Sequence, residues 1–473
     1  MIAGTLHQRL RSRPNYQWLV LGTVCLGTFM GAMDSSIVNV TLPLLSDIFK
    51  VDIPTIGWIA IAYQLTSTST LGTFGRMTDV FGRRFIYISG FAIFVLGSAL
   101  CGLADTALVL ILFRVVQGIG SAMLVANSMA LITGVFPSQK RGMAIAFLET
   151  SVSAAFTIAP TLGGLLQTWL GWRSIFYVNV PIGIVGFVLA YVIIADPPRD
   201  AKRRPLDLPG AFCLSVGLCA LLVALTRGFD QGPTAGAFQL LTIPGVIFLG
   251  LFILVEKRTP DPTIDLGLFS GRVFAGANAA KVFAYCAMSS VTFLMPFYLE
   301  QALHYSPTLT GLGMTALPIA LAAGSMTGGP LSDRFGSHVL APIGMIVAAS
   351  GALVLARISP DAGYPPAMVA MLLLGLGMGL FIVPNDSAIM GAAPRDKLGV
   401  ASGILATTRN LGLSSGIAFA GTLLAARVQI YSAAHLTVVT PFVAAFRDVY
   451  LITIAMCLAA MVLSLFRGKA GHG

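Results

Sequence analysis

The sequence predicts an all-helical, polytopic membrane protein built from two related halves. Three observations lead to this fold class: the composition, the length of the apolar segments, and a motif that occurs twice. Of the 473 residues, 56% are hydrophobic and only 10% are charged, whereas soluble chains average about 25% charged residues. A chain with so little charge cannot cover itself with polar surface in water, so we expect it to lie in a bilayer.

The apolar segments have the length of membrane-spanning helices. They run for about 20 residues, roughly twice the length of a barrel strand. Only helices and closed barrels satisfy their backbone polar groups inside a bilayer. We therefore predict fourteen spanning helices, at residues 17–42, 55–75, 85–104, 107–134, 142–166, 174–194, 208–226, 238–255, 273–298, 307–328, 338–357, 365–391, 399–424 and 447–466.

A charged motif occurs once in each half of the chain. Residues 75–84 read GRMTDVFGRR, and residues 329–338, which lie 254 positions later, read GPLSDRFGSH. A second pair of similar segments, PSQKRGMA at 137–144 and PRDKLGVA at 394–401, is offset by 257 positions. Two repeats with nearly equal offsets indicate two related halves, which is the organisation of many secondary transporters.

The repeats and the spans together define the predicted domain organisation. Two six-helix bundles flank a pair of additional central spans. The predicted segments are an N-terminal tail (1–16), a first six-helix bundle (17–194), a linker with two additional spans (195–272), a second six-helix bundle (273–466) and a C-terminal tail (467–473).

The basic residues predict the orientation in the membrane. Twenty of the 29 Lys and Arg residues fall in segments on the same side as the N-terminus, and six fall on the other side. Because basic loops stay in the cytoplasm, both termini are expected there. This distribution also accounts for the net charge of +10. No soluble basic domain is present, so we expect no nucleic-acid partner.

The sequence shows no motif for an enzyme, a metal site or a cofactor. It has no Walker-type phosphate loop, no His-Glu-x-x-His, no Cys-x-x-Cys and no Gly-x-Ser-x-Gly with a plausible triad. We therefore expect no catalytic residues, no metal and no cofactor. A proton gradient is the expected source of energy.

Five segments resemble motifs of the major facilitator superfamily, in its fourteen-helix drug:proton antiporter branch (EmrB/QacA-like). The resemblance implies the fold of that superfamily, in which two six-helix bundles are related by pseudo-two-fold symmetry, with two extra central helices. The segments are MDSSIVNVTLP at 33–43, the loop motif at 75–84, RVVQGIG at 114–120, APTLGG at 159–164 and WRSIFYVNVP at 172–181.

Asp34 and Arg114 are the candidate proton-coupling residues. Asp34 lies in the first predicted span, and a carboxylate in a poorly hydrated cavity can exchange a proton near neutral pH. Arg114 lies inside the fourth span, where a charge costs a few kcal/mol unless it is compensated. The resemblance implies a coupling role for both. The alternatives are a helix-end carboxylate in contact with interfacial water and a structural arginine satisfied by neighbouring helices.

Other polar residues inside the predicted spans are candidates for cavity, substrate or secondary proton sites, because intramembrane charges are often functional. Arg409 matches a basic position common in this branch. A structural ion pair, such as Lys281 with Asp386, is the alternative reading. The candidates are Glu149, Asp386, Lys281, Arg409, Tyr63, Gln64 and Asn39.

Two motifs have mechanical roles by resemblance. The loop motif is implied to be a conformational latch, and a solvated loop that only sets topology is the alternative. Pro160, Gly163 and Gly164 form the implied helix-5 gate motif, in which proline bends the helix and glycines allow close helix approach. The latch residues are Gly75, Asp79, Gly82 and Arg83, with Asp333 and Gly336 in the second copy.

The expected function is proton-coupled antiport by alternating access. The resemblance implies export of amphipathic, cationic toxic compounds or drugs across the bacterial inner membrane. The expected partners are a small-molecule substrate, protons and the lipid bilayer, and the chain is expected to be a monomer. Some relatives work with a periplasmic adaptor and an outer-membrane channel, and others act alone. The alternatives are a dedicated exporter of one metabolite, lipid or siderophore-like compound, and a proton-coupled importer.

Overall fold

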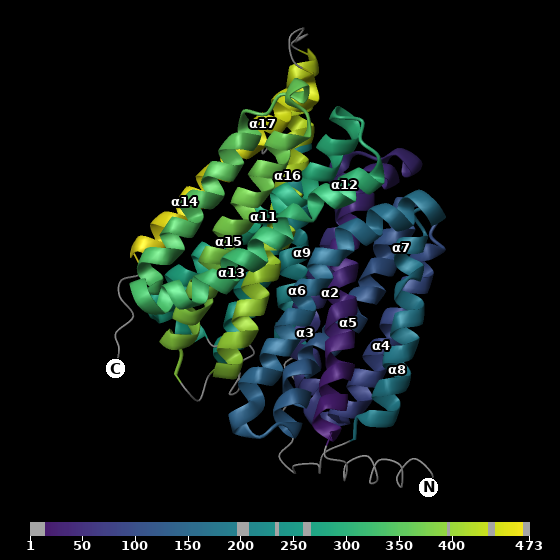
Figure 1. Ribbon diagram of the computed structural model, residues 1–473, viewed down its shortest axis with the longest axis vertical. Coiled ribbons are helices and arrows are strands. Elements are labelled where there is room, and N and C mark those ends of the chain that lie inside the picture. The colour runs from purple at the N-terminus through teal and green to yellow at the C-terminus, as the bar shows by residue number, and fades with distance from the viewer. Residues whose placement is uncertain are drawn as a thin grey trace.

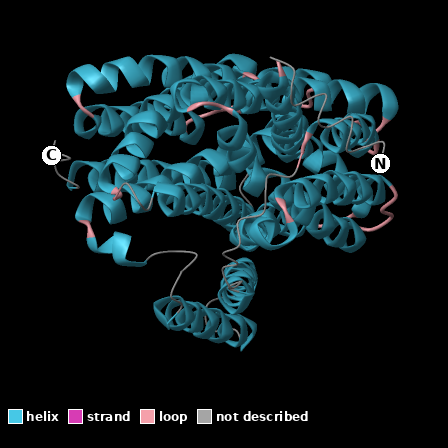
Figure 2. Ribbon diagram, turned by 90° about the horizontal axis from the view of Figure 1, so that it is seen from below, coloured by secondary structure: helices cyan, strands magenta, loops and turns pink. Residues whose placement is uncertain are grey.

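The computed structural model describes residues 15–195, 208–231, 236–258, 266–394, 398–433 and 440–466. Within these ranges every regular element is a helix, as Figure 2 also shows. The first part of the chain forms α2 (Tyr16–Phe49), α3 (Ile53–Phe81), α4 (Arg83–Gly102), α5 (Ala107–Val135), α6 (Ser138–Leu170), α7 (Ser174–Tyr177) and α8 (Asn179–Ile193). The central pair is α9 (Leu208–Gln231) and α10 (Gly236–Arg258).

The second half repeats this arrangement with a few short additional turns. Its elements are η1 (Leu266–Ser270), α11 (Arg272–Phe297), η2 (Tyr298–Ala302), α12 (Pro307–Met314), α13 (Ala316–Phe335), α14 (Ser337–Ala356), η3 (Pro360–Ala362), α15 (Tyr364–Ala392), α16 (Leu398–Ala433) and α17 (Pro441–Phe466).

The two halves lie side by side. In Figure 1 the first half, purple to teal, lies on the right, and most of the second half, green to yellow, lies on the left. Within the first half, α2 packs against α6, and α4 packs against α5 and α8. Within the second half, α13 and α14 pack against α15, and α11 packs against α16. Contacts of α3 with α16, α6 with α12 and α2 with α11 join the halves.

Matching backbone conformations support the relation between the halves. Lys50 and His304 have φ angles of 54° and 55°, and they are the two described non-glycine residues with positive φ. Gly82 and Gly336 have φ angles of 93° and 86°. Each pair is 254 positions apart. Glycine is favoured in this conformation because it has no Cβ, which explains why this glycine recurs in both copies of the motif.

Helix α3 in the first half and helix α12 in the second, which follow Lys50 and His304, also begin in the same way. The Asp52 carboxylate accepts a hydrogen bond from the backbone N–H of Thr55 at 3.2 Å. The Ser306 hydroxyl, again 254 positions later, accepts one from Leu309 at 3.4 Å. Both side chains satisfy an N–H group that has no partner inside the helix.

Helices occupy all fourteen predicted ranges, but the structure does not establish fourteen spans. Among the described residues, eleven helical segments are long and apolar enough to cross a membrane. The remaining ranges correspond to α3, α9 and α10. Helix α3 is less apolar because residues 64–73, QLTSTSTLGT, are rich in hydroxyl groups. The central helix α9 packs against α3, α16 and α10. The count of fourteen stays a prediction.

Candidate functional site

Asp34 and Arg114 form a buried ion pair inside the first half. Asp34 lies in the middle of α2, and Arg114 lies two turns into α5. Nη1 of Arg114 is 2.5 Å from Oδ2 of Asp34, and both residues have 0% of their surface exposed. The structure thus brings together the two residues predicted for proton coupling, which lie 80 positions apart in the chain.

Two neutral amides complete the surroundings of Asp34. Nε2 of Gln117 and Nδ2 of Asn179 each donate a hydrogen bond to Oδ1 of Asp34 at 2.8 Å. Nε2 of Gln117 also donates to the Ser98 hydroxyl at 2.7 Å. The carboxylate therefore has donors on both oxygens, from α5 and α8.

Neither of these two amides is among the site residues predicted from the sequence. Both lie inside segments that carry the resemblance, RVVQGIG and WRSIFYVNVP. Those motifs were therefore the available signal, but no pattern in the sequence shows that the two side chains turn toward Asp34.

The guanidinium group of Arg114 has further partners. Its Nε donates to the backbone carbonyl of Ile59 at 3.1 Å, and its Nη1 donates to Oε1 of Gln117 at 2.6 Å. Its central carbon lies 4.1 Å from the ring centroid of Tyr63. A buried ion pair is tolerated when its remaining hydrogen-bonding groups are satisfied. Both oxygens of Asp34 have donors, whereas Oδ1 of Asn179 is buried without a partner among the described residues.

A large cavity lies between the two halves, next to this ion pair. Its volume is about 1220 Å³. Arg114 and Tyr63 form part of its wall, while Asp34 does not reach the wall. Lining residues come from α2, α3, α5 and α6 on one side, and from α11, α12, α13, α15 and α16 on the other. Leu214 of α9 and Phe252 of α10 also contribute. The cavity extends to Gly75 near the end of α3 and to Val400 near the start of α16.

Several predicted cavity residues lie on this wall. Tyr63, Gln64, Asn39 and Arg409 all line the cavity. Nε2 of Gln64 donates to the hydroxyl of Ser35 at 3.0 Å, whereas Oδ1 of Asn39 has no hydrogen-bond partner among the described residues. This oxygen is buried, so it is an unsatisfied acceptor in the described conformation.

The described part of the cavity wall carries positive charge. Its charged residues are Arg114, which is paired with Asp34, and Arg409. Among the described residues, Nε of Arg409 donates to the amide oxygen of Asn410 at 3.4 Å. The described lining contains no carboxylate that would bind a cationic substrate.

Lys281 and Asp386 form an ion pair in the second half. Nζ of Lys281 lies 2.8 Å and 2.9 Å from the two carboxylate oxygens of Asp386. The Lys281 side chain is 4% exposed and that of Asp386 is 32% exposed. The pair joins α11 to α15, and neither residue lines the cavity. This geometry agrees with the structural alternative stated for these residues.

Three predicted site residues lie outside the described side chains. They are Glu149 in α6, Asp79 in α3 and Asp333 in α13. Within the first loop motif, Nη1 of Arg83 donates to the carbonyl of Ala130 at 3.0 Å, which joins the start of α4 to α5.

The helix-5 gate motif lies at a tight contact between the halves. A Cβ added to Gly164 would overlap the carbonyl oxygen of Pro307, and a Cβ added to Gly311 would overlap that of Pro160. The hydroxyls of Thr161 and Thr315 are also hydrogen-bonded across the interface at 2.7 Å. We name this contact between α6 and α12 the outer seal. It lies at the opposite end of the helices from Gly82 and Gly336.

Gly163 packs within its own half. A Cβ at this position would meet the side chain and backbone of Ile37 on α2. Gly163 therefore fixes α6 closely against the helix that carries Asp34.

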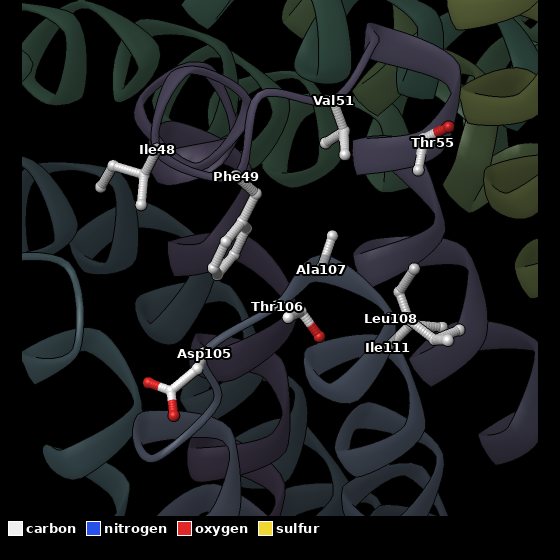
Figure 3. A pocket seen from close by; sticks show the side chains of 9 residues that line it. All are labelled: Ile48, Phe49, Val51, Thr55, Asp105, Thr106, Ala107, Leu108 and Ile111. Atoms are coloured by element: carbon white, nitrogen blue, oxygen red, sulfur yellow. The ribbon is translucent and has the colours of Figure 1, made fainter.

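A second, smaller pocket lies at the end of the first half where the outer seal is located. It has a volume of about 420 Å³ and is lined by side chains from α3, from the start of α5 and from the end of α2, including Phe49 and Asp105 (Figure 3). All of its lining residues belong to one half. It does not lie on a route between the halves.

Comparisons with known proteins agree with this architecture. The family model described as Major Facilitator Superfamily matches residues 24–263 and 277–472. The chain is 31% identical over 450 residues to the riboflavin transporter RibZ of Clostridioides difficile (strain 630), covering 95% of this chain and 97% of that protein. It is 33% identical over 426 residues to the multidrug resistance protein Stp of Mycobacterium tuberculosis (strain CDC 1551 / Oshkosh), covering 90% and 79%.

Solved structures show the same fold at lower sequence identity. The crystal structure of a D-xylose-proton symporter aligns with a TM-score of 0.70 at 17% identity, covering 96% of this chain and 99% of that one. An inward-facing, unoccupied bacterial homologue of the human lysosomal transporter Spinster aligns with a TM-score of 0.69 at 17% identity, covering 96% and 98%. From the family match and the full-length relatives, the chain belongs to the Major Facilitator Superfamily of membrane transporters.

Proposed function

We propose that this protein is a proton-coupled antiporter of the fourteen-helix drug:proton branch, which exports amphipathic small molecules across the bacterial inner membrane. The single observation that carries the proposal is the buried Asp34–Arg114 pair at the wall of a cavity between two halves. Relatives named as a multidrug resistance protein and a multidrug transporter support export of toxic compounds. Both walls of the cavity come from one chain, so a monomer suffices for the cycle.

The proposed coupling follows from the charge of the pair. With Asp34 ionised, the pair with Arg114 is neutral. A proton on Asp34 leaves the guanidinium charge uncompensated, with the Ile59 carbonyl and the amide oxygen of Gln117 as its remaining acceptors. A buried charge without a counter-charge is costly. Protonation therefore favours a conformation in which water reaches Arg114.

Alternating access follows from the two ends of the interface. The outer seal closes one end through α6 and α12, and the cavity extends toward Gly75 and Val400 at the other end. The basic loops predict that this second end faces the cytoplasm. We propose that the described conformation is open to the cytoplasm and that the outer seal separates when substrate leaves.

We also propose that α9 and α10 cross the bilayer as two additional spans. Large apolar side chains are exposed along α10, as expected for a helix that contacts lipid: Leu240, Ile243, Val246, Ile247, Leu251 and Leu254. Single cysteines at Gln231, the last residue of α9, and Gly236, the first residue of α10, test this topology. An impermeant thiol reagent added to intact cells should label both, and labelling only after cell lysis would contradict it.

A dedicated transporter of one metabolite is the second candidate. A relative named as a riboflavin transporter aligns over 95% of this chain. Hydroxyl and aromatic groups, including Ser35, Tyr63 and Tyr285, line the cavity and suit a flat compound with several hydrogen-bonding groups. Broad drug sensitivity on deletion of the gene favours multidrug export, whereas unchanged drug sensitivity favours this alternative.

Transport into everted membrane vesicles tests the proposed function. With an acidic lumen, an antiporter should accumulate substrate in the lumen, and the accumulated compound should leave when an ionophore dissipates the proton gradient. Ethidium and riboflavin serve as separate probes, and vesicles without the protein are the control. Accumulation only when the gradient is reversed would identify a symporter and contradict antiport.

A further inference from the structure

Glu300 is an acidic residue of the spanning region that the coupling scheme does not use. It lies in η2, a π-helical turn that continues α11 to Ala302. Leu303 donates its backbone N–H to the carbonyl of Tyr298 at 3.1 Å, the wider spacing of such a turn. Turns of this kind are frequent at functional sites. The predicted span ends at residue 298, so Glu300 lies outside the range predicted from the sequence.

The Glu300 side chain lies partly buried beside a second unsatisfied group. Its Oε1 atom is buried and has no hydrogen-bond partner among the described residues. Thr310 on α12 is 0% exposed, and its hydroxyl likewise has no partner there. The two groups are neighbours, although their positions fall outside hydrogen-bond geometry. An ionised carboxylate in such a place is costly, whereas a protonated carboxyl group is neutral and provides a donor for the Thr310 hydroxyl.

A like charge from the other half acts on the same carboxylate. Asp47, near the end of α2, interacts electrostatically with Glu300. Two carboxylates that are brought together repel one another unless one binds a proton. Asp47 belongs to the opposite bundle, so its charge acts on Glu300 across the interface between the halves.

The other elements packed against this turn bring no described counter-charge to Glu300. On α17, Arg447 donates to the carbonyl of Ile358, and Asp448 accepts from Tyr431 and pairs with Arg427. On α12 the facing group is the Thr310 hydroxyl. Within the described part of the chain, Asp47 is thus the one charged group found to act on Glu300.

Thr310 also connects Glu300 to the outer seal. The next residue, Gly311, packs directly against the backbone of Pro160 on α6. Helix α12 therefore contacts Glu300 through one residue and the opposite half through the following one. A change in the charge of Glu300 acts on the helix that closes the interface.

We propose that Glu300 is a second proton-binding site, located in the outer seal and supplied by the medium on that side of the membrane. This inference rests on the proposed alternating access. Oε1 of Glu300 takes a proton from water when the outer end is open, and the neutral carboxyl group is then buried beside Thr310 and Asp47 as the seal closes. The same proton returns to that medium when the seal opens. The site senses the proton, and Asp34 remains the group proposed to carry coupling.

The direction of the pH effect follows from proton binding. The closed seal binds one more proton than the open seal, so a lower pH favours the closed state. For one proton the ratio of the two states changes up to tenfold per pH unit. External acidity would thus return the empty carrier to the conformation that opens toward the cytoplasm.

A distance measurement across the outer end tests the proposal without any substrate. Spin labels at Leu170→Cys in the first half and Ala362→Cys in the second half report whether the seal is closed. Both positions are exposed. The protein is reconstituted in lipid nanodiscs in an Asp34→Asn background, which removes the central site from the titration. The population with the short distance should rise as pH falls.

The variants decide the outcome. Glu300→Gln, which mimics the protonated group, should hold the seal closed at every pH. Glu300→Asp keeps a titratable group, so it should retain a pH dependence and shows that the turn tolerates substitution. Asp47→Asn should shift the transition to higher pH. An unchanged pH dependence in Glu300→Gln would overturn the proposal. Vesicle transport is measured separately. Loss of the pH-dependent distance change concerns Glu300, whereas absence of gradient-driven accumulation concerns antiport.

Discussion

Oδ2 of Asp34 and Nη1 of Arg114 are 2.5 Å apart in the interior of the first bundle, and neither residue is exposed. Each residue compensates the charge of the other at a depth where neither charge could stand alone. Arg114 reaches the wall of the cavity and Asp34 does not. A change in the protonation of Asp34 therefore changes the net charge of the pair at the cavity wall, where Arg114 lies. This relationship is the basis of the proposed coupling.

Replacing Arg114 should destabilise the protein more than replacing Asp34. Arg114→Gln leaves the Asp34 carboxylate buried without a cation, and such a loss costs about 3–5 kcal/mol. Asp34→Asn leaves the Arg114 guanidinium with the Ile59 carbonyl and the Gln117 amide oxygen as acceptors, so a smaller loss is expected. The double variant should recover much of the stability. Thermal unfolding of the purified protein in detergent measures all three.

The exposed pair of Arg173 and Asp105 provides a matched control for that comparison. Their separation is 3.2 Å, and their side chains are 47% and 87% exposed. Exposed pairs contribute about 0–1 kcal/mol, so Arg173→Gln should have little effect. Equal losses for Arg114→Gln and Arg173→Gln would contradict the account of the buried pair.

Methyl groups in the outer seal should prevent its closure. Gly164→Ala and Gly311→Ala each place a Cβ where a carbonyl oxygen of the other half lies. Both variants are expected to favour separation of α6 from α12 and to lower transport severely. Gly22→Ala is the control, because nothing lies within 4 Å of the added Cβ. Labelling of a cysteine placed at the seal by an impermeant reagent should increase in the first two variants only.

The ion pair of Lys281 with Asp386 should behave as a structural link. Lys281→Met and Asp386→Asn should each lower stability, since each leaves the other charge without its partner. The double neutral variant, or the exchanged pair Lys281→Asp with Asp386→Lys, should restore it. Unfolding temperature and vesicle transport are compared. Restored stability without restored transport would show that these residues do more than hold α11 to α15.

Export of a cationic substrate should depend on Glu149 and not on Arg409. Glu149 follows Leu148 and lies one turn before Val152, both of which line the cavity. The charged residues of the described lining are arginines. If Glu149 also serves this cavity, as predicted from the sequence, export of cationic ethidium should require it. Glu149→Gln should therefore lower ethidium export more than riboflavin export, and Arg409→Gln should not. Equal loss of both probes in Glu149→Gln would remove this residue from cation binding.

Much of the fold and part of the site could be predicted from the sequence. Apolar length predicted the helix ranges, and the repeated motif predicted two related halves. The charges of Asp34 and Arg114 made them stand out, because a charge inside a span needs a partner. Gln117 and Asn179 are neutral, and only the rotation of α5 and α8 shows that they bind Asp34.

Glu300 and the second-half residues of the outer seal could not be predicted from the sequence, for different reasons. The π-helical turn carries α11 past residue 298, where the apolar run ends. The contact of Gly164 with Pro307 joins residues from different halves. It depends on which end of the interface is closed, and a single sequence is compatible with either state.

Gradient-driven accumulation by Asp34→Asn in everted vesicles tests the central claim most directly. Ethidium and riboflavin are each followed with and without an acidic lumen, and protein levels are matched to the parent. The account predicts that the variant still lets a transported probe equilibrate across the membrane but no longer concentrates it when the lumen is acidified. Accumulation equal to that of the parent protein would show that Asp34 is not the residue that couples protons to transport.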